Sequence, residues 1–233
     1  MRFSQILERR YSMDREKYFA ELSRILANEG IETAAPQNGR LPVLLNGQPA
    51  FRVEAPGFLC KAPGDLKTRE ADELYDRTAP IAEMVKEYMT AMEQAPILRA
   101  KSLDEDYRLL SDFNGYVLAG FEMEKNYGYK FVTWQRDYDR TGVGLGHYFI
   151  DKYTAAKEDF AVRSGLIPEK KLFTPEQFTE MYKCIKGMLE GGYELTYDSE
   201  KKLGEIREQI ERVVPDVEER IAQAQSQAPE MNI

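Results

Sequence analysis

Histidine and cysteine are scarce in this sequence. The chain of 233 residues holds one histidine, His147, and two cysteines, Cys60 and Cys184, which stand far apart. Zinc sites need Cys or His ligands at short spacing, and no such pair or cluster occurs, so we expect no metal site and no bound cofactor. Two isolated thiols favour a reducing cytosol, although one disulfide is arithmetically possible.

A long apolar run is missing as well. No segment approaches the roughly 18 apolar residues that are needed to span a bilayer. The first residues, MRFSQILERRYSMDRE, lack the apolar stretch of a signal peptide. We therefore expect a cytoplasmic protein that has no membrane partner.

Positive charge is in deficit. The chain has 32 lysines and arginines against 40 aspartates and glutamates, with a net charge of −8 and a pI of about 5.0. Contacts to phosphate need clustered Lys and Arg, so this balance does not favour nucleic acid as a partner. Between residues 190 and 220, ten acidic residues stand against five basic ones. That segment is either a solvated helix or an acidic face that mimics nucleic acid or docks on a basic protein.

The first hundred residues combine helical and strand-like patterns. Apolar residues recur at helical spacing in residues 12–30 and 68–94, where Pro80 predicts a kink or two abutting helices. The pair Asn46-Gly47 is preferred in type I′ turns and predicts a small two-stranded hairpin over residues 43–54. Pro42 and Pro49 lack an N–H, which predicts that they lie on exposed edges.

Residues 107–150 show the pattern of an antiparallel meander. Short runs rich in aromatic and β-branched residues alternate with glycine-containing turns, the first of them at Asn114-Gly115. Helical sequence returns at residues 151–165, and Thr174 with Gln177 predicts a capping box for the next helix. A last helix is expected from about Asp198.

Together these patterns predict an α+β fold. We expect a helix-rich N-terminal part with the hairpin over residues 1–100. A core domain over residues 105–222 holds a meander of three to four strands packed with C-terminal helices. Residues 223–233 are expected to form a flexible tail.

The stretch TGVGLGHYF, residues 141–149, is the strongest candidate for chemistry. A phosphate-binding loop needs Gly-Lys-Ser/Thr before a helix, whereas these glycines run into strand-like sequence. The pattern favours a turn or bulge over a loop that contacts a ligand. His147 is a weak catalytic candidate, because a lone imidazole needs a partner carboxylate, and Asp137, Asp139 and Asp151 are close in sequence.

Two further groups are candidates for binding. Tyr129, Phe131, Trp134 and Arg136 combine aromatic and basic side chains, as a stacking platform for single-stranded nucleic acid does, although core packing is the commoner outcome for strand aromatics.

In the last helix, Leu203, Ile206 and Ile210 follow an apolar rhythm that suits packing on the domain or on a partner.

The second half of the chain resembles a known group of sequences. The segments that carry the resemblance are LLSDFNGYVLAGFEMEKNYGYKFVTW, GHYFIDKYTAAKEDFAVRSGLIP and LFTPEQFTEMYKCIKGMLEGGYELTYDSEKKLGEIREQIERVVPDVEERI, within residues 105–222. They are similar to uncharacterised proteins encoded on conjugative and mobilisable elements of gut Gram-positive anaerobes. The resemblance implies accessory cargo of mobile DNA, and it implies no activity, cofactor or site residue.

The sequence thus favours a non-catalytic accessory protein that binds and modulates another macromolecule, with a host-defence or DNA-processing protein as a candidate target. Two alternatives stay open at this point. One is a nucleic-acid-binding module that uses the meander aromatics, and the other is an enzyme centred on His147.

Overall fold

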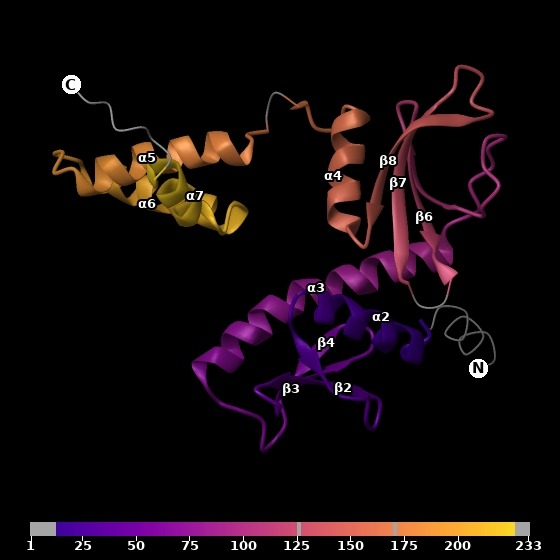
Figure 1. The fold of residues 1–233 in the computed structure, drawn as a ribbon, viewed down its shortest axis with the longest axis horizontal. Helices are drawn as coiled ribbons and strands as arrows, with labels where there is room; N and C mark the ends of the chain where they lie inside the picture. Colours follow the sequence, from indigo (N-terminus) through magenta and orange to yellow (C-terminus); the bar gives the residue numbers. More distant parts are fainter. Residues whose placement is uncertain (1–12, 125–126, 170–171, 227–233) are drawn as a thin grey trace, which may run out of the picture. The chain divides into compact units, whose positions relative to one another are not determined.

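The computed structural model describes residues 13–124, 127–169 and 172–226 (Figure 1). The chain forms two compact units, Met1–Ile167 and Pro168–Ile233. The sequence predicted a division between residues 100 and 105 instead. The predicted tail starts inside the last helix, which continues to Ser226, and residues 227–233 lie outside the described residues.

Within the described residues, the first elements of the first unit are helix α2 (Arg15–Asn28) and a four-stranded antiparallel sheet. Its strands are β1 (Glu32–Thr33), β2 (Arg40–Leu45), β3 (Gln48–Glu54) and β4 (Phe58–Cys60), in that order. Asn46 and Gly47 join β2 to β3 with φ of 53° and 76°, as the predicted turn requires. The hairpin is confirmed, and it forms the centre of a larger sheet. The two outer strands of that sheet are too short to show an alternation of apolar and polar residues in the sequence.

Pro42 corrects one expectation. It is buried in β2, an inner strand, and does not lie on an exposed edge. Its carbonyl accepts a hydrogen bond from the N–H of Ala34, just beyond the end of β1, at 3.0 Å. The N–H and C=O of a strand residue point to the same side, so the donor that Pro42 lacks would face Ala34, and the reciprocal ladder bond is absent just where β1 ends.

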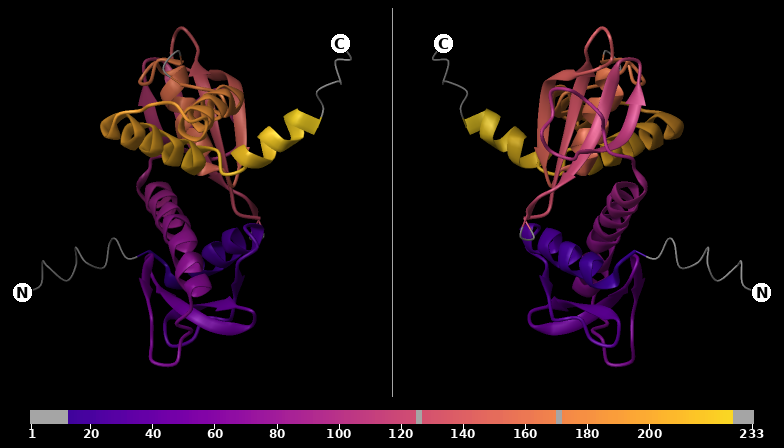
Figure 2. Two further views of the ribbon diagram at one scale, coloured as in Figure 1. Left: turned by 90° about the vertical axis from the view of Figure 1, so that its left-hand side faces the viewer. Right: turned by 90° about the vertical axis from the view of Figure 1, so that its right-hand side faces the viewer.

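Helix α3 (Arg69–Gln94) is one continuous helix that contains Pro80, so the expected pair of abutting helices does not occur. Thr68 caps its start, as its hydroxyl accepts a hydrogen bond from the N–H of Ala71. Figure 2 shows α2 and α3 on the same side of the first sheet. Leu22 and Leu26 of α2, Val85 of α3 and Phe51 of β3 belong to the same buried core.

The second sheet of this unit is the predicted meander, and it has four antiparallel strands. They are β5 (Arg108–Phe113), β6 (Tyr116–Glu122), β7 (Tyr129–Arg136) and β8 (Val143–Ile150), in sequence order. Helix α4 (Tyr153–Arg163) contacts β6, β7 and β8. On one face Phe131 packs against Tyr88 of α3 and Tyr153 of α4, and on the other Trp134 packs against Tyr107. The fold is therefore α+β, as predicted.

The second unit contains helices α5 (Pro175–Glu190), α6 (Tyr197–Val213) and α7 (Val217–Ser226). The capping box that the sequence predicts at Thr174 and Gln177 is present at the start of α5. The helices enclose a small core of their own, made of Tyr182, Ile185, Ile210, Val214, Val217 and Ile221.

Candidate functional site

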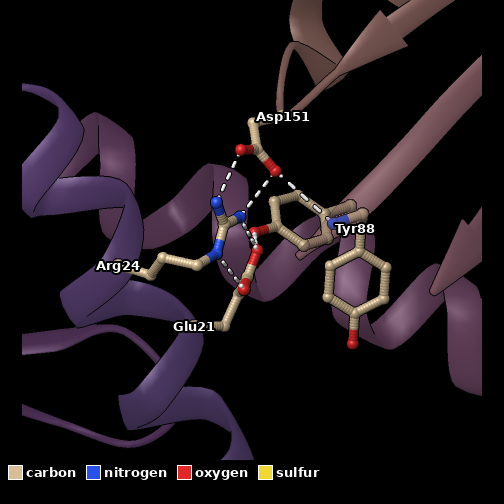
Figure 3. Close-up of polar contacts among 5 residues, drawn as sticks. Glu21, Arg24, Tyr88 and Asp151 are labelled. Atoms are coloured by element: carbon tan, nitrogen blue, oxygen red, sulfur yellow. Dashed lines mark hydrogen bonds and ion pairs between the residues drawn. The ribbon is translucent and has the colours of Figure 1, made fainter. Parts of the chain in front are cut away.

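A polar network links α2, α3 and the end of β8. Arg24 binds Glu21, with Nε–Oε2 3.0 Å and Nη2–Oε1 2.8 Å, and it binds Asp151, with Nη1–Oδ2 2.5 Å and Nη2–Oδ1 2.6 Å (Figure 3). Tyr88 donates its hydroxyl to Glu21 Oε1 at 2.5 Å. One guanidinium thus holds two carboxylates in bidentate contacts, which is the geometry that Arg forms best.

The backbone around this network is adapted to it. Asp151, directly after β8, has φ of 58°, a conformation that Asp tolerates better than most residues. Gly128 has φ of 85°, and any Cβ there would overlap the Arg24 guanidinium. Burial, and then the neighbouring carboxylate of Glu21, raises the pKa of Tyr88 far above its ordinary value, so Tyr88 stays a hydrogen-bond donor.

Three cavities surround the first turns of α2 and meet one another. One of about 650 Å³ includes the network residues Glu21 and Arg24, and one of about 250 Å³ shares Lys17, Glu122 and Tyr129 with it. A third, of about 680 Å³, joins them through shared acidic residues. We call this concavity the α2 groove and define it by the residues Glu16, Lys17, Glu21, Glu93, Glu122 and Tyr129.

Tyr129 is the central side chain of the α2 groove. It is only 3 % exposed, yet its hydroxyl has no hydrogen-bond partner among the described residues. Burial raises its pKa well above the ordinary value, and the carboxylates of Glu122, Glu21 and Glu93 raise it further. A neutral phenol therefore lies in the combined negative field of three carboxylates.

The cavities of the groove are lined by cations of the protein's own as well, Arg15, Lys17, Arg24 and Arg108, and Lys17 is the one that contacts Tyr129. Lys17 Nζ lies 2.6 Å from Glu122 Oε2 and 5.9 Å from the centroid of the Tyr129 ring. Both contacts are favourable for an ammonium group, the first as an ion pair and the second as a cation–π contact. The arrangement is chemically suited to binding positively charged side chains. Among the described residues, no three His, Cys, Asp or Glu side chains come together as a metal site.

His147 lies in β8, where its Nδ1 is 2.9 Å from Asp159 Oδ1 of α4. The partner is thus none of the three aspartates that are near it in sequence. Asp159 also accepts the hydroxyl of Thr133, a buried group that is not free to act as a nucleophile. The imidazole itself is exposed, with 56 % of its side chain accessible.

The glycine stretch is an edge strand with a β-bulge, in agreement with the predicted turn or bulge. The register between β7 and β8 shifts between Thr133 and Gln135, and Leu145 on the opposing strand has φ of 50°. Arg163 of α4 spans the opening, because it donates to the carbonyls of Thr133 at 2.9 Å and Leu145 at 2.6 Å. This contact satisfies polar groups that the bulge leaves without a strand partner.

The meander aromatics do not form an exposed stacking surface. Tyr129, Phe131 and Trp134 are buried, because helices cover one face of β7 and residues 98–107 contribute to the core on the other. Arg136 pairs with Asp112 at 2.7 Å, and its side chain is 10 % exposed.

The three candidate apolar residues of α6 differ in their burial. Ile210 is buried and Leu203 packs partly against the same core, whereas Ile206 is 45 % exposed. The three residues therefore do not form one free apolar face. At about 100° per residue Ile206 lies about 40° around the helix from Ile210, on the side away from Leu203, at the margin of the buried stripe.

Sequence reasoning missed Glu21, Arg24 and Asp151 as a group. The spacing of Glu21 and Arg24 on one helix suggests a pair, but nothing local connects them to Asp151, which is more than a hundred residues away. The same holds for Glu93 and Glu122, which reach the groove from α3 and β6.

Within residues 13–124, 127–169 and 172–226, no helix combines the length and apolar content that a membrane crossing requires. Comparisons with protein-family models, with curated proteins and with solved structures find no match to this chain.

Proposed function

We propose that this protein is a non-catalytic accessory protein that binds a basic segment of another protein in the α2 groove. The observation that carries the proposal is Tyr129, a tyrosine that is 3 % exposed, whose hydroxyl has no hydrogen-bond partner within the described part of the chain and lies in the field of Glu21, Glu93 and Glu122. A lysine or arginine of the partner supplies the missing hydrogen bond and the opposite charge.

Charge complementarity favours a basic partner. Glu16, Glu93 and Asp106 line the cavities, and none of them has an ion-pair partner among the described residues. The floor of the smallest cavity contains Met89 and Met92, whose flexible side chains suit a surface that adapts to apolar groups. An amphipathic segment with positive charges next to apolar side chains matches both features.

The same features argue against phosphate-rich partners. Carboxylates in the groove repel a nucleic-acid backbone, and the aromatic residues that were candidates for base stacking are buried. The resemblance to proteins of mobile elements suggests where the partner belongs. A host-defence or DNA-processing protein, which carries basic surface for its own contacts with DNA, is the target that we propose.

The test is a selection from a display library of random short peptides on the immobilised full chain. Enrichment of peptides that combine Lys or Arg with apolar residues is expected. Affinities of the enriched peptides are then measured for the Tyr129→Phe and Glu93→Gln variants, with Glu208→Gln on exposed α6 as the matched control. We expect each groove variant to weaken binding about fivefold, which corresponds to about 1 kcal/mol, and the control to leave it unchanged.

Enrichment of acidic peptides, or affinities that the groove variants do not change, would overturn the proposal. Binding of a labelled single-stranded oligonucleotide at physiological salt, lost with rising salt, would instead support the nucleic-acid alternative. Circular dichroism of each variant establishes that it is folded before its binding is compared.

A further inference from the structure

The free edge of the second sheet is unusual in its chemistry. β8 is the last strand of the order β5-β6-β7-β8, and it has eight residues. From Thr141 to Ile150 the chain contains no Asp, Glu, Lys or Arg. Natural sheets protect their edges with charges, prolines or bulges, because an open edge pairs with other strands. β8 has one such device, the bulge at Leu145, and between that bulge and the end of the strand at Ile150 it has no Asp, Glu, Lys or Arg.

The hydrogen bonds to β7 identify which groups of β8 are free. Asp151 donates its N–H to the carbonyl of Tyr129 at 3.0 Å, so the residues of β8 at every second position before it also bond to β7. The alternate residues, Tyr148 and Ile150, direct their N–H and C=O groups away from β7. The Gly146 carbonyl is anti to the His147 N–H across their trans peptide bond, and because that N–H points toward β7, the carbonyl points away from β7. No other described segment bonds to these groups.

The part of β8 whose outward backbone groups are unpaired is bounded at each end by a residue with positive φ. Leu145 and Asp151 both have positive φ, 50° and 58°, and the five extended residues 146–150 lie between them. Just before the bulge, the Ser102 hydroxyl binds the N–H and the carbonyl of Val143, at 3.2 Å and 3.0 Å, and closes that part of the edge. Tyr148 is therefore the centre of the available backbone. We call residues 146–150 the β8 edge segment.

The geometry points to a second copy of this chain as the occupant of the β8 edge segment. When two copies pair antiparallel about a two-fold axis at Tyr148, the Tyr148 groups of the two copies bond to each other and each Gly146 carbonyl accepts from the Ile150 N–H of the second copy, in about four hydrogen bonds. Tyr148 then faces Tyr148 of the second copy, and Gly146 faces Ile150 of the second copy, so a small residue lies opposite a large one. Because the segment has no charge, self-pairing brings no like charges together.

Two of the three exposed side chains of the β8 edge segment are largely apolar, and the third is the His147 imidazole, which pairs with Asp159. Tyr148 is 61 % exposed and Ile150 is 60 % exposed, and the Tyr148 ring lies edge-on to Trp134 at 6.1 Å. Pairing of two copies covers these groups. The pairing joins only residues 146–150 of each copy, whereas a standard interface uses about 20–30 residues a side, so a weak dimer with a dissociation constant in the micromolar range is expected.

Sedimentation velocity of the full chain over a range of concentrations tests the inference. The wild-type mass is expected to rise from 26.9 kDa toward twice that value as concentration increases. Tyr148→Lys is expected to stay monomeric, because two ammonium groups then face each other across the axis. Tyr138→Lys, the same change at a fully exposed residue in the turn before β8, is the matched control and is expected to dimerise like wild type.

A mixture distinguishes loss of pairing from loss of folding. Tyr148→Lys and Tyr148→Glu are each expected to be monomeric, and an equimolar mixture is expected to form a mixed dimer, since opposite charges then meet at the axis. A wild-type protein that is monomeric at every concentration would overturn the inference, as would a dimer that Tyr148→Lys leaves intact or a mixture that fails to associate. Tyr129→Phe, which tests the α2 groove, is expected to dimerise normally, so the two proposals fail separately.

Discussion

The two sheets of the first unit have the same topology and different edges. Each has four antiparallel strands in sequence order. In the first sheet the outer strands, β1 and β4, have two and three residues, so little backbone is left unpaired. In the second sheet the outer strands, β5 and β8, have six and eight residues. Short edges protect a sheet from unwanted pairing, and a long uncharged edge is a surface for association.

The buried faces of the two sheets also differ. Leu41, Val43 and Val53 of the first sheet contribute aliphatic side chains to the core. The second sheet contributes Tyr129 and Phe131, which pack with tyrosines of α3 and α4. The core on the second sheet therefore contains groups that ionise in alkali, whereas the strands of the first sheet contain none at these positions. This difference gives the two sheets different responses to pH.

Alkaline pH is expected to have the largest effect. Burial raises the pKa of Tyr88, Tyr129 and Tyr153 far above the ordinary value near 10. These tyrosines remain protonated in the folded protein and ionise once unfolded. Their stabilising contribution is thus complete below about pH 10 and is lost as pH rises above it. We expect cooperative unfolding in alkali, followed by tyrosinate absorbance and circular dichroism.

The tyrosines of the second sheet should set the onset of that transition. Tyr153→Phe is expected to move the onset to higher pH, because it removes one ionising group from the core. The fully exposed Tyr138, changed to Phe in the same way, is expected to leave the onset where it is. Equal behaviour of the two variants would contradict the role of the buried tyrosines.

Loss of the Arg24 network is expected to have the next largest effect. Arg24→Met leaves Glu21, 7 % exposed, without its cation, and the free energy of unfolding should fall by about 3 kcal/mol. Urea denaturation measures this loss, with fluorescence of the single tryptophan, Trp134, as a probe of the second sheet. Far-UV circular dichroism follows both sheets, and a separation of the two transitions would show that the network couples them.

Arg69→Met is the control for this measurement. Arg69 pairs with Glu73 on the exposed side of α3, with 88 % of its side chain accessible, so its removal is expected to change stability by less than about 0.5 kcal/mol. A loss for Arg24→Met no larger than that of the control would contradict the importance of the network.

A smaller effect is expected within β8 itself. A Cβ at Gly146 would lie 2.8 Å from Trp134 Cδ1 and closer still to Nε1, so Gly146→Ala must displace the indole and should cost about 2 kcal/mol. Gly144 has no neighbour within 4 Å of the same atom, and Gly144→Ala is expected to be near neutral. Thermal or urea unfolding of the two variants compares them directly. A similar cost at both positions would imply that backbone flexibility, not space, is the reason for these glycines.

The smallest difference is expected between the two Asn-Gly turns. Gly47 in the first sheet and Gly115 in the second have φ of 76° and 79°, and a Cβ at either would meet nothing within 4 Å. Replacing either glycine by Ala should therefore lower the free energy of unfolding only by the penalty for a left-handed backbone conformation, about 1 kcal/mol in each sheet. Urea denaturation of both variants tests this equality. Unequal costs would show that one sheet tolerates a disturbed turn better than the other.

Several features of this protein follow from the sequence alone. The Asn46-Gly47 turn, the capping box at Thr174 and the antiparallel meander depend on residues that are neighbours in the chain, so local patterns predict them. The alternate glycines of residues 142–146 likewise predict the turn or bulge, and the absence of Gly-Lys-Ser/Thr argues against a phosphate loop. Local conformational preferences act within a few residues, and the class of the fold emerges from their sum.

Only the tertiary structure decides which distant groups meet. It pairs His147 with Asp159, it brings Asp151 to Arg24, and it buries Tyr129 at the floor of a groove whose carboxylates come from α2, α3 and β6. It also determines that the outward groups of Tyr148 have no partner in the described chain. Each of these facts depends on the packing of helices and strands that are far apart in sequence, and no periodicity or spacing encodes that packing.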